Sequence, residues 1–354
     1  MKKHNFYAGP SILSEYTIKN TAAAVEDFAG MGLSLLEISH RSKEFVAVND
    51  EARALIKELL DVPAGYEVVF MGGGASMQFC MVPYNLLNKK ASYLDTGTWA
   101  SNAIKEAKLF GEVDVVASSK DKNYTYIPKG YAIADDSDYF HFTSNNTIYG
   151  TEMRKDPDVK QRLVCDMSSD IFSRPIDISK YDIIYAGAQK NMGIAGLGVA
   201  IIREDLLQDV AQTTPVLLDY KLMIKNDSMY NTPPAYAIYV LGLVLEWIDS
   251  LGGLEVMKER NKKKAKLIYD YLDQSTFYKA HSDKENRSLM NVTFTTPNKD
   301  LDAKFVKESI EAGMTNLKGH RSVGGIRASI YNAMPYEGVE KLVAFMKEFE
   351  ENNR

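Results

Sequence analysis

The sequence predicts an α/β protein, in which a large domain with a mainly parallel central sheet covered by helices precedes a smaller α+β C-terminal domain. Three observations support this. Short apolar runs alternate with helix-like segments through the first 200 residues, several of these runs end at a glycine or a polar turn, and the last hundred residues differ in pattern. The chain has 354 residues, 45% of them hydrophobic, which is enough for two cores.

In the first 200 residues, helices are expected at 51–60 and 101–110. Short strands are expected at residues 68–71, 112–117, 139–142, 163–165, 182–185 and 198–202. Strands separated in this way by helical segments indicate parallel β-α-β units, with both faces of the sheet covered.

The last hundred residues begin with an expected helix at 254–273, whose lysine-rich run at 261–266 is interpreted as a solvated face. Strands are expected at 290–294 and 324–330, and helices at 303–312 and 339–349, the last with one apolar face. We therefore predict a large domain at 15–253. The smaller domain would combine 1–14 with 254–354.

Composition argues against several classes of protein. A net charge of −5 is unlike that of a nucleic-acid binder. Two cysteines and five scattered histidines form no metal-binding motif, so no metal is expected. The N-terminus lacks the apolar stretch of a signal peptide, and the most apolar run, 235–245, is too short to span a bilayer. We predict a cytoplasmic protein without a membrane partner.

Two polar residues follow neighbouring predicted strands. Lys190 lies in a glycine-containing turn after residues 182–185, and Asp166 follows residues 163–165. Because strand ends in α/β sheets share one edge, both side chains are expected there. Lys190 is then either a surface lysine or an amine nucleophile near a cofactor. Asp166 is either a turn residue or the partner of a protonated pyridine nitrogen.

Two further turns carry candidate cofactor contacts. Gly72-Gly-Gly-Ala75-Ser76 follows a strand, and small residues there let backbone N–H groups approach a phosphate, although a plain tight turn is equally consistent. The spacing matches neither a Walker loop nor a dinucleotide-binding loop. Trp99 follows another turn and can either stack on a planar ring or pack in the core.

Arginines supply candidate anion contacts. His40-Arg41 and His320-Arg321 form two similar pairs far apart in the chain. They are either surface ion-pairing groups or donors that converge on one dianionic substrate group. Arg327, in the predicted strand 324–330, is a candidate clamp for a carboxylate.

Longer stretches carry a family resemblance along almost the whole chain. They are Gly9-Pro10 and residues 37–45, 103–108, 173–177, 185–190, 231–234, 318–321 and 327–335. In this order they resemble the phosphoserine aminotransferase family, which belongs to the class V aminotransferases of pyridoxal 5′-phosphate (PLP) fold type I. The resemblance implies the same α/β fold and PLP as the cofactor.

The resemblance also assigns contacts to the cofactor ring. It implies that Lys190 is the Schiff-base lysine and that Asp166 pairs with the pyridinium nitrogen. Trp99 would stack on the ring, and Thr147 would hydrogen-bond on the side of the ring hydroxyl.

Contacts to the cofactor phosphate are implied from two subunits. Ala75, Ser76 and Gln189 would come from the same subunit as the lysine. Asn231 and Thr232 would come from the neighbouring subunit, which implies an obligate homodimer with shared active sites.

The implied reaction transfers the amino group of L-glutamate to 3-phosphohydroxypyruvate, giving O-phospho-L-serine and 2-oxoglutarate. Forming 4-phosphohydroxy-L-threonine for vitamin B6 synthesis is a second implied reaction. The implied ligands of the substrate phosphate or side-chain carboxylate are His40, Arg41, His320 and Arg321, with Arg327 on the α-carboxylate. Two positions depart from some family members: Ala8 replaces a serine that contacts substrate, and Ala75-Ser76 replaces a form with arginine.

Two alternative functions remain. One is another class V enzyme, such as an alanine–glyoxylate transaminase or a cysteine desulfurase. The desulfurase needs a mobile nucleophilic cysteine, and neither Cys80, in a helix-like segment, nor Cys165, beside Asp166 on a strand, suits that role. The other is a non-enzymatic phosphometabolite-binding protein that uses the His-Arg pairs alone.

Overall fold

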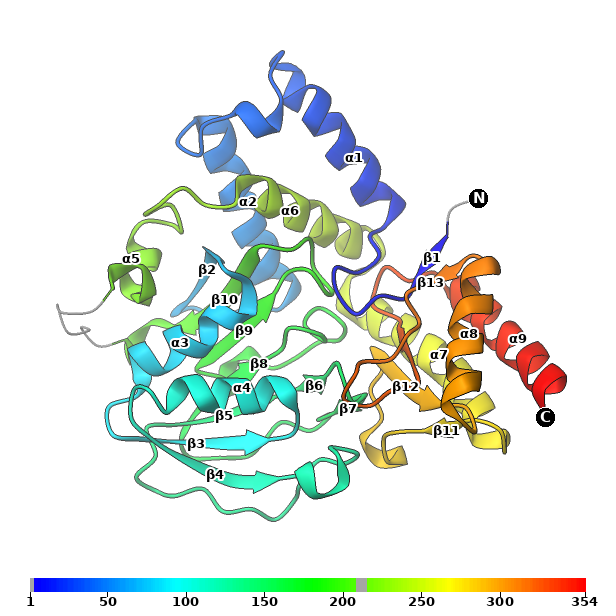
Figure 1. Cartoon of the computed structure of the whole chain (residues 1–354). Helices are drawn as coiled ribbons and strands as arrows, with labels where there is room; N and C mark the ends of the chain where they lie inside the picture. Colours follow the sequence, from blue (N-terminus) through cyan, green and yellow to red (C-terminus); the bar gives the residue numbers. More distant parts are fainter. Residues whose placement is uncertain (1–2, 208–214) are drawn as a thin grey trace.

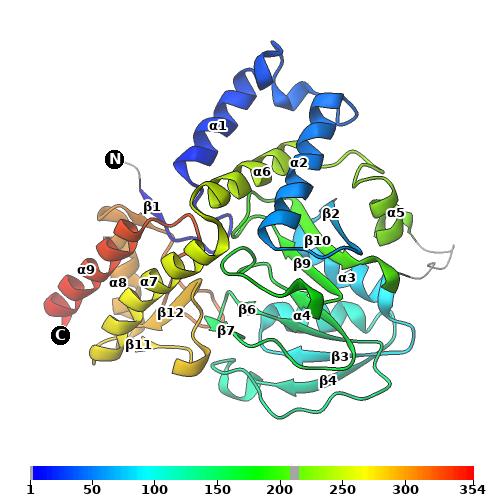
Figure 2. The same ribbon diagram turned by 180° about the vertical axis from the view of Figure 1, so that it is seen from behind.

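The computed structural model describes residues 3–207 and 215–354 and has a central sheet with helices on both faces (Figures 1 and 2). The seven strands have the order β2-β10-β9-β8-β5-β3-β4. They are β2 (Tyr66–Gly72), β3 (Lys90–Asp95), β4 (Glu112–Ser118), β5 (Tyr139–Thr143), β8 (Arg162–Asp166), β9 (Ile183–Gly187) and β10 (Leu197–Arg203). The six strands expected in this region are present. β3 was indicated only by the turn that follows it.

The sheet is mainly parallel, as predicted, but β10 is an exception. It pairs antiparallel with both β2 and β9. The expectation of parallel β-α-β units is therefore wrong for this strand. The physical reason is the short connection between Gly187 and Leu197, which contains no helix and cannot carry the chain back across the sheet.

Both faces of the sheet are buried, and alternation along β2 shows how. Val68 and Phe70 pack into a core with helices α2 (Lys43–Leu59) and α6 (Ala235–Ser250). Val69 and Met71 pack into a second core on the opposite face. The helices there are α3 (Gly74–Leu86), α4 (Thr98–Ala107) and α5 (Tyr220–Lys225). Because helices cover both faces, the ends of the strands are the part of the sheet that stays accessible.

The C-terminal part has its own smaller sheet, beside the large one in Figure 1. β11 (Lys279–Ala280), β12 (Asn291–Thr295) and β14 (Ile326–Ser329) form it, and α7 (Gly253–Gln274), α8 (Lys299–Glu311) and α9 (Tyr336–Asn353) pack with it. Near the N-terminus, β1 (His4–Asn5) pairs with β13 (Met314–Thr315), and Phe6 lies in this core. These contacts support grouping 1–14 with the C-terminal domain, whose boundaries stay a prediction.

The described part of the chain also contains α1 (Glu15–Glu26), β6 (Asn145–Asn146) and β7 (Thr151–Glu152), together with seven 3₁₀ helices of three residues each. In the described residues, no single helix is both long and apolar enough to cross a membrane. Only α6 and α7 taken together, bent by 84° at the break between them, meet the length and composition criteria.

The lysine-rich run of α7 corrects one prediction. Lys262 and Lys266 form ion pairs on the exposed side of the helix, but Lys264 is only 1% exposed. Its ammonium group donates to the carbonyls of Ile330 and Tyr331 at 3.0 and 2.6 Å. The interpretation as a solvated face is wrong at this position, because charge alone does not show which side of α7 faces the segment after β14.

Candidate active site

A cavity of about 440 Å³ lies at the edge of the large sheet where β2, β8 and β9 end. Six of the predicted cofactor residues line it: Ala75 and Ser76 at the start of α3, Trp99 in α4, Asp166 at the end of β8, and Gln189 and Lys190 after β9. Thr147, a seventh, is hydrogen-bonded to Lys190 but does not line the cavity itself. The predicted convergence of Asp166 and Lys190 at one sheet edge is confirmed.

The amine of Lys190 has a specific environment. Its Nζ donates to Thr147 Oγ1 at 2.7 Å and lies 5.6 Å from the centre of the Trp99 ring. The pKa of Lys190 is lowered to about 8, mainly by burial; Asp166 raises this pKa and Arg327 lowers it. A substantial fraction of the amine is therefore neutral, and nucleophilic, near neutral pH.

This lowered pKa predicts how the apoprotein combines with PLP. Only the neutral amine attacks an aldehyde, so the rate should rise about tenfold per pH unit below pH 8 and level off above it. An ordinary lysine would continue to gain rate to about pH 10.5. Stopped-flow absorbance measures this, with Nα-acetyl-lysine as the control for ionisation of PLP itself. A rate that still rises above pH 9.5 would contradict the assignment.

Asp166 is held in place by Ser168. The backbone N and the Oγ of Ser168 both donate to Asp166 Oδ1, at 2.9 and 2.6 Å, and Ser168 Oγ accepts from Gly187 N at 3.1 Å. Burial raises the pKa of Asp166, while Lys190 and Ser168 lower it. In the described residues no hydrogen bond reaches Oδ2, so this oxygen can meet a pyridinium N–H. The sequence pattern assigned no role to Ser168.

The start of α3 forms an anion site. Gly73 and Gly74 have φ angles of 91° and 61°, which favour glycine, and the helix then begins with free backbone N–H groups. A Cβ on Gly198 would lie 2.9 Å from Gly74 O, so β10 packs directly against this turn. The side-chain oxygen of Gln189 is buried here without a hydrogen-bond partner in the described residues. A phosphate fits this lining.

These features fit PLP as a whole. The cavity offers an amine, a carboxylate, a tryptophan ring and a helix N-terminus, which match the aldehyde, the ring nitrogen, the ring face and the phosphate of that cofactor. Trp99 Nε1 is also buried without a partner in the described residues, so this side chain is not held there by a polar contact of its own.

Arg327 lies close to Lys190, and His320 lies close to Arg327. Arg327 Nη1 is 3.4 Å from the carbonyl oxygen of Thr147, whose side chain contacts Lys190. Burial lowers the pKa of Arg327, and burial together with Arg327 and Arg321 lowers the pKa of His320. Arg327 makes no ion pair with the described residues, so its guanidinium is available to a substrate carboxylate.

Eight candidate residues do not line this cavity. Thr147, Arg327 and His320 lie close to it, whereas His40, Arg41, Asn231, Thr232 and Arg321 are the other five. Asn231 and Thr232 are exposed in the segment before α6, and their side chains make no hydrogen bond in the part of the chain that the structure describes. Arg321 instead lines a separate cavity of about 590 Å³ beside α8. In one subunit, therefore, only the second His-Arg pair lies near Arg327.

The two cysteines are poor nucleophiles. Cys165 is fully buried in β8, and burial raises the pKa of its thiol well above the ordinary value. Cys80 is partly buried, and burial and Glu106 raise its pKa. Neither forms a thiolate readily, which argues against desulfurase chemistry.

Comparisons with known proteins agree with this site. The family model for class-V aminotransferases matches residues 4–342. A phosphoserine aminotransferase from Parabacteroides distasonis is 74% identical over the full length of both chains. The solved structure of phosphoserine aminotransferase from Bacillus circulans subsp. alkalophilus has a TM-score of 0.97 and 46% identity, covering 100% of this chain and 99% of that one.

A PLP-bound phosphoserine aminotransferase from Trichomonas vaginalis has a TM-score of 0.94 and 39% identity, and the match covers 98% of this chain and all of that one. The α/β sheet, the lysine after β9 and the carboxylate after β8 thus occur in a fold shared with PLP enzymes. The chain belongs to the class-V aminotransferases, in the phosphoserine aminotransferase family.

Proposed function

We propose that the chain transfers the amino group of L-glutamate to 3-phosphohydroxypyruvate, with PLP as cofactor, giving O-phospho-L-serine and 2-oxoglutarate. The observation that carries this proposal is that Lys190 and Asp166 line one cavity, with Arg327 close enough to Lys190 to lower its pKa. When bound, the cofactor supplies an aldehyde that condenses with amino groups and a ring that accepts electrons.

Each residue of the site has a separate role in the proposed reaction. Arg327 binds the α-carboxylate and orients Cα toward Lys190. With PLP bound, the amine of Lys190 would act first as the base that takes the proton from Cα and then as the acid that gives it back. Thr147, 2.7 Å from that amine, orients it through a hydrogen bond. Asp166 would hold the ring nitrogen in its protonated form, and Trp99 would hold the ring.

We further propose a homodimer with shared active sites. Asn231 and Thr232 present exposed polar groups that do not reach the cavity of their own subunit. His40 and Arg41, just before α2, are also outside it. Both segments flank the packed pair α2 and α6, whose side chains meet in one core. A second copy would bring these groups to the cavity from outside.

Arginine variants test the substrate assignment. Arg41→Ala and Arg321→Ala should each raise KM for the phosphorylated keto acid by about 10- to 100-fold, because each removes a charge-assisted contact to an anion. The Kd of PLP should change by less than about threefold, since neither guanidinium is assigned to the cofactor. Steady-state kinetics and PLP titration measure the two effects. Equal losses in both would count against the assignment.

A screen of amino donors and keto acids on the holoenzyme identifies the substrates. Activity with glutamate and 3-phosphohydroxypyruvate is expected, and the precursor of 4-phosphohydroxy-L-threonine is included as the second candidate. A purified protein that shows no visible PLP absorbance after added PLP would instead favour a phosphometabolite-binding protein. A cytoplasmic location remains part of the proposal.

A further inference from the structure

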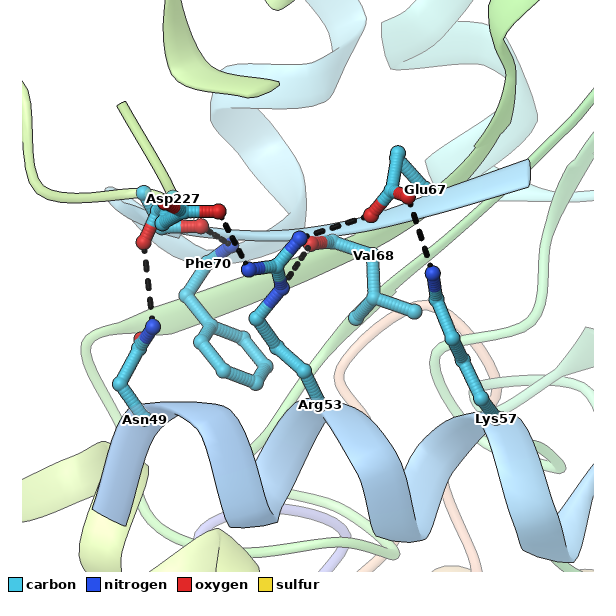
Figure 3. Close-up of polar contacts among 8 residues, drawn as sticks. Asn49, Arg53, Lys57, Glu67, Val68, Phe70 and Asp227 are labelled. Carbon is cyan, nitrogen blue, oxygen red and sulfur yellow. Dashed lines mark hydrogen bonds and ion pairs between the residues drawn. The ribbon is translucent and has the colours of Figure 1, made fainter. Parts of the chain in front are cut away.

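Arg53 joins α2 to two other segments outside the cavity (Figure 3). Its Nη1 donates to Asp227 Oδ1 at 2.6 Å, and its Nη2 donates to Glu67 Oε2 at 2.7 Å. Its Nε donates to the carbonyl of Val68 at 3.1 Å, on the free side of the edge strand β2. The side chain is only 15% exposed, so one guanidinium uses three donors in a largely buried position.

The turn at Asp227-Ser228 depends on such contacts. Both residues are in the left-handed region, with φ angles of 49° and 69°, which is costly for two consecutive residues other than glycine. Besides Arg53, two contacts from other segments hold them. Asn49 Nδ2 donates to the carbonyl of Asp227 at 3.1 Å, and Phe70 N donates to Ser228 Oγ at 2.8 Å (Figure 3).

The chain leaves this turn toward Asn231 and Thr232. Only Met229 and Tyr230 separate them from Ser228, and Tyr230 is 40% exposed. No strand ladder or helix holds 229–232, because α6 begins only at Ala235. Asn231 and Thr232 therefore lie between this turn and the buried Pro233 at the entry to α6, and the turn fixes their N-terminal side.

We propose that Arg53 is a positioning residue: by holding the turn, it presents Asn231 and Thr232 to the cofactor phosphate of the partner subunit. This inference rests on the proposed dimer with shared sites. We expect the effect of Arg53 at the partner's site rather than at the site of its own subunit. β2 leads to the phosphate loop of its own subunit, but this strand is paired with β10 along its whole length and is held without Arg53. The turn has no such ladder.

The first test compares two variants of the same helix face. Arg53→Met keeps the aliphatic stem but removes the guanidinium, and should raise the Kd of PLP about tenfold. Lys57→Met is the matched control, because Lys57 lies one turn later and contacts Glu67 at 3.0 Å but not the Asp227 turn. Its Kd should stay within about twofold of the wild-type value. Titration of the apoprotein measures both.

The second test separates an effect on the partner from an effect within one subunit. In one heterodimer, a Lys190→Ala subunit is paired with an Arg53→Met subunit. In the other, both changes lie in one subunit and the partner is wild-type. Each heterodimer has one Lys190, and the visible absorbance of lysine-bound PLP reports only that site. Weak binding is expected only in the second heterodimer, whose intact site receives the unsupported turn.

Equal Kd values in the two heterodimers, or weakening only in the first, would overturn the inference. Light scattering on the same samples identifies a different failure: a monomeric protein would refute the shared-site dimer itself. Asp227→Asn serves as a second variant if Arg53→Met does not fold, since asparagine accepts the left-handed conformation and this side chain is 56% exposed. It should give the same pattern with a smaller shift.

Discussion

Replacing Lys190 with alanine is expected to abolish transamination, with a loss of at least about 10⁴-fold in kcat. The side chain has two roles in the proposed reaction: it holds the cofactor covalently and it moves the proton at Cα. Among the described residues that line the cavity, Lys190 is the one lysine, so no second amine there can take over. The visible absorbance of lysine-bound PLP should disappear together with turnover.

The matched control is Lys105→Ala, on the exposed side of α4, the helix that carries Trp99. It removes an ammonium of the same size without touching the cavity and should leave absorbance and kcat unchanged. Adding methylamine to the Lys190→Ala protein should restore part of the proton transfer, because a small amine can occupy the vacated space. A Lys190→Ala protein that keeps the lysine-bound absorbance would show that another lysine holds the cofactor.

The parts of the site that could be predicted from sequence depend on local rules. Asp166 and Lys190 each follow an apolar strand, and neighbouring parallel strands end at one edge, so their convergence needed no knowledge of packing. The glycines before Ala75 indicated a turn by another local rule, because glycine adopts the backbone conformations that tight turns need. The family resemblance then supplied roles that no spacing could give, such as those of Thr147 and Gln189.

Other features depend on contacts between distant segments. Lys264 looks like any lysine in a charged run, and only the packing of α7 against the segment after β14 shows that carbonyls surround it. Arg53 and Asp227 are 174 positions apart, and no periodicity links them. The antiparallel β10 depends on the length of a loop. Side chains proposed to act in a partner subunit cannot be placed from the pattern of one chain.

Replacing Asp166 with asparagine is expected to lower kcat by about 10³-fold with little loss of PLP. The amide has nearly the same volume, so packing in β8 is preserved, but it carries no negative charge to retain a proton on the ring nitrogen. The ring then accepts electrons poorly when Cα loses its proton. The phosphate loop and Lys190 still hold the cofactor, so the Kd of PLP should change far less than kcat.

The same substitution should also shift the titration of Lys190. The Asp166 carboxylate raises the pKa of Lys190 against the effect of burial, so removing the charge should move the inflection in the PLP recombination rate below pH 8. A local structural defect would not produce this direction of change.

N1-methylated PLP provides the decisive comparison, because its ring nitrogen is permanently positive and needs no carboxylate to keep it so. It should bring the Asp166→Asn protein closer to wild-type kcat, measured as the single-turnover rate with glutamate, and should not improve the wild-type protein. Ser168→Ala should fall between the two, since it removes one of the two hydrogen bonds to Oδ1 but leaves the charge. Methylated PLP could instead bind to the Asp166→Asn protein without raising its single-turnover rate. The carboxylate would then act by positioning the ring rather than by its charge, and Asp166, like Trp99, would be a residue that orients the cofactor.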